Sequence, residues 1–272
     1  MTYVSGQPIT ASDFNTLFAN KVNATWSTGS GSAGWGQTAV NTVASTNLIT
    51  AAQWNDYITK ANLAYRHINN GAAAPITGSA ALGSQINIIA NMETTANNVN
   101  ANALSGLTGV AGPSLSRNTG SAFQQTSTSS SATYTFGSYD QMRWFFNANG
   151  QIYFNAVYTP AATNAKNTDW SSIAGNLGTT YVTRNNFYGI GTNTQLSSIS
   201  YSVNGTYGAG NYAFFRGSVS GSSLIIQLYA QDTGEGTLLD AGDTLGFITA
   251  YFYSTYPSTS YLSSSWGTIS LA

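Results

Sequence analysis

Four of the nine acidic residues lie in one short stretch late in the chain, "DTGEGTLLDAGDT": Asp232, Glu235, Asp240 and Asp243. Paired carboxylates can hydrolyse glycosidic bonds, and clustered carboxylates can bind calcium. The spacing does not match an EF-hand loop, because Asp232 is not followed by Asp or Asn at alternate positions. Hydrolysis would need a second carboxylate from elsewhere, and the sequence singles none out. The pattern favours a polar hairpin whose turns use Asp and Gly, with a calcium ion or a hydrolase as the alternatives.

His67 is the only histidine, and the chain contains no cysteine. A Ser/His/Asp triad would have to be built around this one residue, which lies near the end of an expected helix, where a capping or surface histidine is ordinary. Metal sites made of thiolates or of clustered histidines are excluded. The sequence therefore predicts no catalytic residue, no metal site and no cofactor, and we expect the protein not to be an enzyme.

A glycine-rich stretch, "STGSGSAGWGQT", runs from Ser27 to Thr38. Glycine loops can cradle phosphate, but this one lacks the Lys-Ser/Thr ending of a P-loop and the GxGxxG entry into a helix. We interpret it as a surface loop. Trp35 within it is unusual, because an indole is seldom left in a loop without a surface to cover.

Aromatic side chains gather in "YFYSTYPSTSYLSSSW", close to the end of the sequence. Tyr251 and Tyr253 alternate along an expected strand, and we predict that both lie in the core. Tyr256 and Tyr261 fall in a Ser/Thr/Pro-rich loop, where rings are more exposed. They are candidates for a contact with another subunit or for stacking on a glycan.

The composition limits the classes of partner. Only 6% of the 272 residues are charged, against about a quarter in ordinary soluble proteins. Few charges give little repulsion between copies, which suits a permanent assembly or a secreted sugar-binding domain. The net charge of −1 and the absence of a basic stripe argue against nucleic acid. The start "MTYVSGQPIT" has no signal-peptide pattern, and the longest apolar run, 245–253, is about half the ~20 residues of a membrane helix, so we expect neither export nor membrane insertion.

One phrase occurs twice: "ITASDFN" begins at Ile9, and "ITAAQWN" begins at Ile49. In each copy a threonine can cap a helix, and an acidic or amide side chain three residues later can close a capping box. The isoleucine before each cap and the aromatic residue at the fourth helical position form a hydrophobic staple. Apolar residues then recur at helical spacing, so the repeat predicts two short amphipathic helices, 9–26 and 49–68. The repeated Asn15 and Asn55 have no role in this device.

A third, longer helix is expected over roughly 81–104, packed on its own domain or forming a weak self-associating stalk. It completes a helical attachment region, 1–104. The Gly/Pro/Ser-rich segment 105–121 is interpreted as a linker, and 122–272 as a β domain. There "MRWFFNANGQIYFNAVY" predicts a hairpin about Asn149-Gly150, and "DWSSIAGNL" predicts one short helix. Strands are expected in "ATYTF", "YAFFRGSV", "SLIIQLYAQ", "TLGFITAYFYS" and "SISYSVN", the last with Ile199, Tyr201 and Val203 inward. The fold class is therefore α+β and mainly β, with an antiparallel β-sandwich or jelly-roll-like domain.

In their order, these features resemble virion structural proteins, often called tail-fibre-like, of marine cyanophages and related tailed phages. The resemblance rests on the two repeated helix starts, the "TGSGSAGWGQT" loop, "MRWFFNANGQIYF", "DWSSIAGNLGTTYV" and "DAGDTL", which together span nearly the whole chain. Each is short, so the specificity comes from their order. The resemblance implies a virion part made in the host cytoplasm and carries no catalytic motif.

The leading hypothesis is a non-enzymatic fibre, collar, baseplate or capsid-decoration subunit that associates with itself, most plausibly as a trimer, and with other virion proteins. The helices would dock to the particle or to sister subunits while the β domain faces outward, and packing of the two helices on each other is the alternative. The expected docking face comprises Phe14, Leu17, Phe18, Trp35, Trp54, Tyr57 and Ile58. The competing hypothesis is a carbohydrate-binding adhesin that holds a host surface glycan through exposed aromatic side chains.

Overall fold

The computed structural model describes residues 8–81, 89–103, 105–119, 127–202, 210–233 and 246–272. The fold mixes α-helices with antiparallel sheets, and the chain divides into two compact units. The helical unit comprises Met1–Val110, Asp140–Gly150 and Tyr256–Gly267. The β unit comprises Ala111–Tyr139, Gln151–Thr255 and Thr268–Ala272. Each unit is therefore assembled from separate stretches of sequence.

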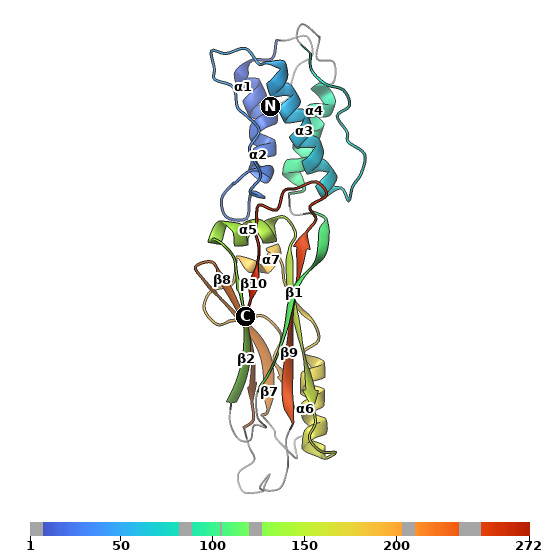
Figure 1. Ribbon diagram of the computed structural model, residues 1–272, viewed down its shortest axis with the longest axis vertical. Coiled ribbons are helices and arrows are strands. Elements are labelled where there is room, and N and C mark those ends of the chain that lie inside the picture. Colours follow the sequence, from blue (N-terminus) through green and yellow to red (C-terminus); the bar gives the residue numbers. More distant parts are fainter. Residues whose placement is uncertain (1–7, 82–88, 104, 120–126, 203–209, 234–245) are drawn as a thin grey trace. The chain divides into compact units, whose positions relative to one another are not determined.

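The helical unit contains both predicted repeat helices. The first runs through α1 (Ala11–Asp13), the π-helical turn η1 (Phe14–Ala19) and α2 (Asn20–Trp26), and the second is α3 (Ala51–Ile68). Both capping boxes are confirmed. The backbone N–H of Asp13 donates to Thr10 Oγ1 at 3.1 Å, and that of Gln53 donates to Thr50 Oγ1 at 3.3 Å. In Figure 1 these helices lie beside α4 (Ile89–Ala101).

The two repeat helices pack on each other through the expected docking face. The ring centroids of Phe14 and Trp54 lie 4.9 Å apart at 87°, and those of Phe18 and Tyr57 lie 5.5 Å apart at 61°. All seven side chains of that face are buried, including Trp35. Mutual packing, the alternative left open by the sequence, is therefore what the structure shows. In this structure the seven side chains form core, not an interface.

The repeated asparagines hold the chain that returns along each helix. Asn15 Nδ2 donates to the Val43 carbonyl at 2.8 Å, and its Oδ1 accepts from the Val43 N–H at 2.9 Å. Asn55 makes the same pair of bonds with Ala80, at 3.0 and 2.7 Å. A second asparagine in each copy repeats the arrangement, with Asn23 on Val40 and Asn62 on Ile76. Each copy is therefore a helix whose own side chains fix the extended segment that follows, and we call these four residues the asparagine clamps.

The first copy contains one residue more than the second. Its two clamps are eight positions apart, at Asn15 and Asn23, whereas those of the second copy are seven apart, at Asn55 and Asn62. The π-helical turn η1 overlaps this interval, and the Asn20 N–H donates to the Asn15 carbonyl five positions back. A π turn inserts one extra residue into an α-helix. Both clamps of the first copy therefore still contact the returning chain.

Replacing Asn55 with alanine is expected to lower the free energy of unfolding by about 1–3 kcal/mol, because two part-buried hydrogen bonds to the backbone of Ala80 are lost. Urea unfolding followed by tryptophan fluorescence measures the change. Asn20→Ala is the matched control, since Asn20 is an exposed helical asparagine outside the clamps. Equal unfolding midpoints for the two variants would contradict a role for the clamp.

The third helix is shorter in the structure than expected. α4 covers Ile89–Ala101, while 82–88 and 104 lie outside the described residues. Met92, Ala96 and Val99 are buried as the spacing predicted, and α4 contacts α2 and α3. It therefore packs on its own unit, which is the first of the two alternatives.

Two assignments made from the sequence are wrong. The expected linker 105–121 contains strand β1 (Thr108–Asn118). Its Gly, Pro and Ser residues are tolerated because β1 lies at an edge of its sheet, where among the described strands it pairs only with β9 (Phe247–Pro257). The first strand of the expected hairpin is helix α5 (Tyr139–Asn147), which buries Met142, Phe145 and Phe146 at i, i+3 and i+4. Asn149, with φ of 73°, ends this helix instead of turning a hairpin.

The β unit contains two antiparallel sheets (Figure 1). The four-stranded sheet has the order β1-β9-β3-β4, where β3 is Gln151–Thr159 and β4 is Thr180–Val182. The six-stranded sheet has the order β10-β2-β8-β7-β5, with β6 also paired to β7. Its strands are β10 (Ser270–Leu271), β2 (Ser127–Thr135), β8 (Ser223–Gln231), β7 (Tyr212–Ser220), β5 (Thr194–Gln195) and β6 (Ser200–Tyr201).

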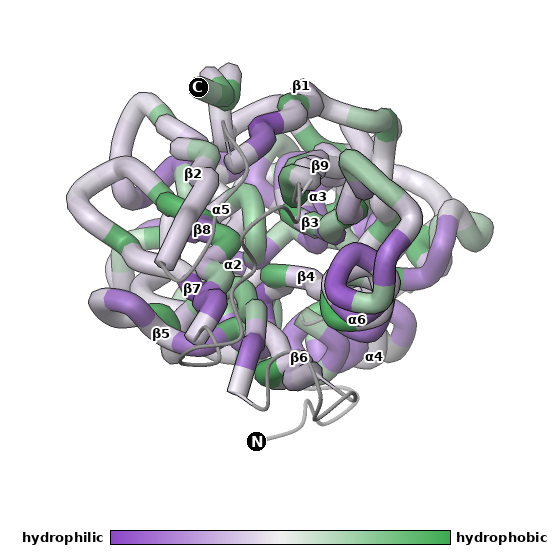
Figure 2. The backbone as a smooth tube through the Cα atoms, turned by 90° about the horizontal axis from the view of Figure 1, so that it is seen from below, coloured by the Kyte–Doolittle hydropathy of each residue, from purple (hydrophilic) through white to green (hydrophobic). Residues whose placement is uncertain are grey.

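The buried faces of the two sheets contact each other. The rings of Phe154 and Phe215 lie 4.6 Å apart, and the Tyr134 hydroxyl donates to the Tyr253 carbonyl at 3.0 Å. Helix α6 (Ala165–Asn176) contacts β3 of one sheet and β6 and β7 of the other. Figure 2 shows both hydrophobic and hydrophilic residues around its turns. This is the short helix that the sequence predicted, and helix α7 (Arg184–Phe187) follows β4.

On two strands, β9 and β6, the side chains that face the core are not those that the sequence predicted. On β9 the buried residues are Ile248, Ala250, Phe252 and Ser254, so Tyr251 and Tyr253 point away from the core. On β6 Ser200 is buried while Tyr201 is 56% exposed, and Val203 lies outside the described residues. Alternation was recognised correctly in both, but aromatic residues were assumed to face inward.

Candidate functional site

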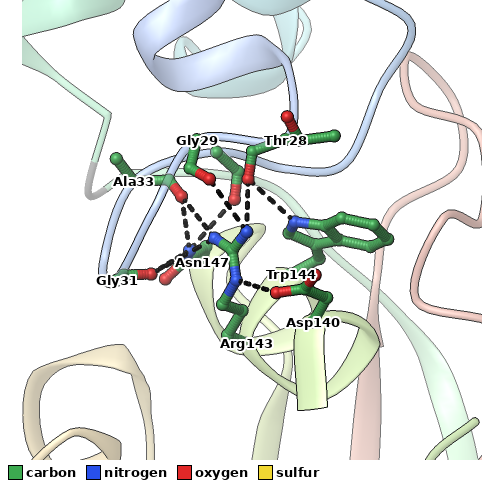
Figure 3. A network of polar contacts seen from close by, with 9 residues as sticks. Thr28, Gly29, Gly31, Ala33, Asp140, Arg143, Trp144 and Asn147 are labelled. Carbon is green, nitrogen blue, oxygen red and sulfur yellow. Dashed lines mark hydrogen bonds and ion pairs between the residues drawn. The ribbon is translucent and has the colours of Figure 1, made fainter. Parts of the chain in front are cut away.

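The carbonyl groups of the glycine-rich loop accept hydrogen bonds from the side chain of Arg143 (Figure 3). The guanidinium of Arg143 on α5 donates to the carbonyls of Thr28 at 2.6 Å, Ala33 at 2.9 Å and Gly29 at 3.0 Å. Its Nε donates to Asp140 at 2.6 Å. A phosphate site would need converging N–H groups, whereas oxygens converge here. The loop is therefore a structural contact, with Arg143 buried in it.

Neighbouring side chains complete this contact. Asn147 Nδ2 donates to the Gly34 carbonyl at 3.0 Å, and Trp144 Nε1 donates to the Thr28 carbonyl at 3.1 Å. Gly36 has φ of +72°, and a Cβ there would overlap the Trp144 indole. Only glycine therefore suits this position.

His67 lies in the core of the helical unit, fully buried. Its ring centroid is 5.0 Å from that of Trp35, and Nε2 lies 3.2 Å from the Ala148 carbonyl. Nδ1 has no hydrogen-bond partner among the described residues. Burial lowers the pKa of His67 to about 4, so the ring is neutral at pH 7. Among the described residues no nucleophile or carboxylate is paired with the ring, and its contacts with Trp35 and Ala148 give His67 a packing role.

The other residues expected to do chemistry are dispersed. Asp232 is buried and pairs with Lys166 of α6 at 3.0 Å, and the remaining three acidic residues of its cluster lie outside the described residues. Tyr256 and Tyr261 are half-buried and pack within the helical unit: Tyr256 contacts Phe145, and Arg66 lies 4.5 Å from the Tyr261 ring centroid. In the described part of the chain, no three His, Cys, Asp or Glu side chains could hold a metal ion together.

The outer face of the six-stranded sheet carries a cluster of four aromatic side chains, which we call the aromatic face: Tyr201, Tyr212, Phe214 and Tyr229. Cross-strand pairing places Tyr201 opposite Tyr212 and Phe214 opposite Tyr229. The ring centroids of these pairs are 5.9 and 5.4 Å apart, at interplanar angles of 51° and 49°. Burial and the neighbouring Tyr229 raise the pKa of the Tyr212 hydroxyl above its usual value, so it remains a donor at neutral pH. The cluster is a partly exposed apolar surface with hydroxyl groups on it.

Polar side chains border the aromatic face. Gln231 accepts from the Tyr229 hydroxyl at 3.0 Å, and Gln227 lies two positions before Tyr229 on the same face. Arg216 pairs with Gln227 across the strands, and its guanidinium lies 5.1 Å from the Tyr229 ring centroid. Serines at 127, 129 and 131 continue the surface on β2.

The outer face of the four-stranded sheet carries a different arrangement, the tyrosine ladder of Tyr181, Tyr153, Tyr253 and Tyr251. Neighbouring rings are nearly parallel, at 27°, 15° and 10°, with centroids 5.7, 4.9 and 6.5 Å apart. The aromatic face also contains a nearly parallel pair, Tyr212 and Phe214, with centroids 6.2 Å apart at 21°. The most exposed ring of the ladder is Tyr181, at 48%, and that of the aromatic face is Tyr201, at 56%.

Comparison with protein-family models, with curated proteins and with solved structures gives no match to this chain. Among the described residues, no helix is both long and apolar enough to cross a membrane.

The aromatic face was not expected from the sequence. Its signal is present in "YAFFRGSV" and "SLIIQLYAQ", where aromatic and polar residues alternate with smaller or aliphatic ones. Ala213, Phe215 and Gly217 point inward on β7, which turns the remaining rings outward. On β7 the two small residues, Ala213 and Gly217, therefore mark the side of the strand that is buried.

Proposed function

We propose that the protein is a non-catalytic binding protein that recognises a glycan through the aromatic face of its β unit, as a component of a phage particle. In this proposal the two antiparallel sheets form a β-sandwich that presents the face. The observation that carries the proposal is the cluster of Tyr201, Tyr212, Phe214 and Tyr229 bordered by amide side chains. The phage context is supported by the sequence resemblance alone.

The chemistry of the aromatic face matches that of a sugar. A pyranose ring has an apolar C–H surface that packs on aromatic rings, and hydroxyl groups that pair with amides and phenols. Exposed aromatic clusters on soluble proteins commonly mark binding sites. Tyr201, more than half exposed, offers ring surface without any loss of core packing.

Tyr201→Ala is expected to weaken glycan binding about tenfold, which corresponds to about 1.4 kcal/mol. A glycan array followed by calorimetry on the best ligand measures the change. Tyr181→Ala is the matched control, because Tyr181 is a 48% exposed tyrosine on the other sheet, and its binding should equal that of the wild type. Loss of binding in Tyr181→Ala alone would contradict the assignment of the face, and a wild-type protein that binds no glycan would contradict the function.

The edge strand β1 favours a second candidate function, a structural subunit that associates with itself. Residues 114, 116 and 117 are exposed, and among the described strands β1 pairs only with β9. Unpaired edges can add a strand from another copy. Light scattering after size exclusion tests this candidate: a trimer that dissociates in Ser116→Lys would support it, and a monomer at high concentration would contradict it.

The virion context has its own test. Gold-labelled antibodies against residues 118–272 on intact phage particles are expected to mark the tail or its fibres. Absence of the protein from denatured particles would contradict this part of the proposal and leave glycan binding standing.

A further inference from the structure

Arg216 is the only charged residue among the outward positions of the described strands of the six-stranded sheet. It lies on β7 between Gln195 of β5 and Gln227 of β8. No carboxylate on this face neutralises it within the described part of the chain. The aromatic face therefore has one fixed positive charge at its border.

The guanidinium of Arg216 is held in one orientation by two contacts. Its Nε donates to Gln227 Oε1 at 2.6 Å, and its Cζ lies over the Tyr229 ring, 5.1 Å from the centroid. Of the three guanidinium nitrogens, these contacts use only Nε as a hydrogen-bond donor. The two terminal nitrogens make no hydrogen bond to any described residue. A guanidinium restrained in this way loses little further side-chain entropy on binding.

Free terminal nitrogens of an oriented guanidinium match a carboxylate, which can accept two parallel N–H···O bonds. The adjacent aromatic rings match an apolar ring surface. A uronic acid unites both properties, because its carboxylate projects from a pyranose ring. Resting on the proposed function, we propose that the glycan is acidic and that Arg216 binds the carboxylate of a uronic acid while Tyr229 and Phe214 contact its ring.

The test is an array in which each uronic-acid oligosaccharide is paired with its carboxyl-reduced, neutral counterpart. The wild-type protein is expected to bind an acidic member about 10–100-fold more tightly than its neutral counterpart, as for hydrogen bonds to charged groups. Arg216→Gln should remove this preference and leave the neutral affinity unchanged. Arg216→Lys should restore only part of it, because an ammonium cannot form the paired bonds.

Tyr201→Ala should weaken the acidic and neutral members equally, which separates ring contact from charge recognition. Equal binding of both members by the wild type, or an unchanged preference in folded Arg216→Gln, would overturn the inference while leaving the proposed function intact. No binding to any member would overturn the proposed function itself. Binding to peptides with a free C-terminal carboxylate in place of glycans would overturn both.

Discussion

Arg143→Met is expected to lower the free energy of unfolding of the helical unit by about 3–5 kcal/mol. Methionine fills a similar volume but offers no donor, so the carbonyls of Thr28, Gly29 and Ala33 lose their shared partner. Since small domains are stable by only about 5–15 kcal/mol, much of the unit's stability would be lost. Trp35, which is buried against Trp26 and His67, remains as the apolar contact of the glycine-rich loop.

Urea unfolding followed by tryptophan fluorescence measures this change, because five of the six tryptophans belong to the helical unit. Arg143→Lys should fall between the wild type and Arg143→Met, since one ammonium cannot reach all the carbonyls. Arg117→Met, an exposed arginine of β1, is the control and should change stability by less than about 0.5 kcal/mol. A midpoint for Arg143→Met equal to that of Arg117→Met would mean that the loop is held by other contacts.

Acid is expected to destabilise the helical unit through His67. The folded pKa of His67 is about 4 because the ring is buried, whereas an unfolded histidine has a pKa of about 6.5. Between these values the unfolded chain binds the proton and the folded chain does not, so stability falls as the pH falls through this window. The loss amounts to about 2 kcal/mol at pH 5 and about 3 kcal/mol at pH 4.

His67→Gln separates this effect from other titrations. The amide can still donate to the Ala148 carbonyl but takes up no proton, so the slope of stability against pH between 6.5 and 4 should largely disappear. Urea midpoints at pH 7, 5.5 and 4.5 for both proteins give the comparison. Parallel slopes would show that another group binds the proton on unfolding.

Local signals in the sequence were interpreted correctly. The two capping boxes and the spacing behind them predicted both repeat helices, because these contacts lie within four residues of each other. The strands at 212–220, 223–231 and 247–257 were recognised by their alternation.

The errors share one physical cause, which is that aromatic residues occur on both faces of an element. In "MRWFF" a strand period of two and a helical period both place large apolar residues on one side, so the sequence does not distinguish a strand from a helix. The contact that holds Arg143 of this helix comes from carbonyl groups more than 100 residues away in the sequence. On β9 the rings of Tyr251 and Tyr253 lie outward, and the core takes alanine and serine as well as Ile248 and Phe252. The aromatic face depends on such assignments and on cross-strand pairing, so no single segment could predict it.

The π turn also affects which changes in the length of the first repeat helix related sequences can tolerate. One extra residue in an α-helix would rotate every later side chain by about 100° around the axis. Here that rotation is absorbed within η1, so Asn23 still faces Val40 just as Asn62 faces Ile76. Selection that retains the two asparagines therefore leaves the number of residues between them free to vary by one. A single-residue gap between two retained asparagines is the difference to expect when related sequences are aligned over this helix.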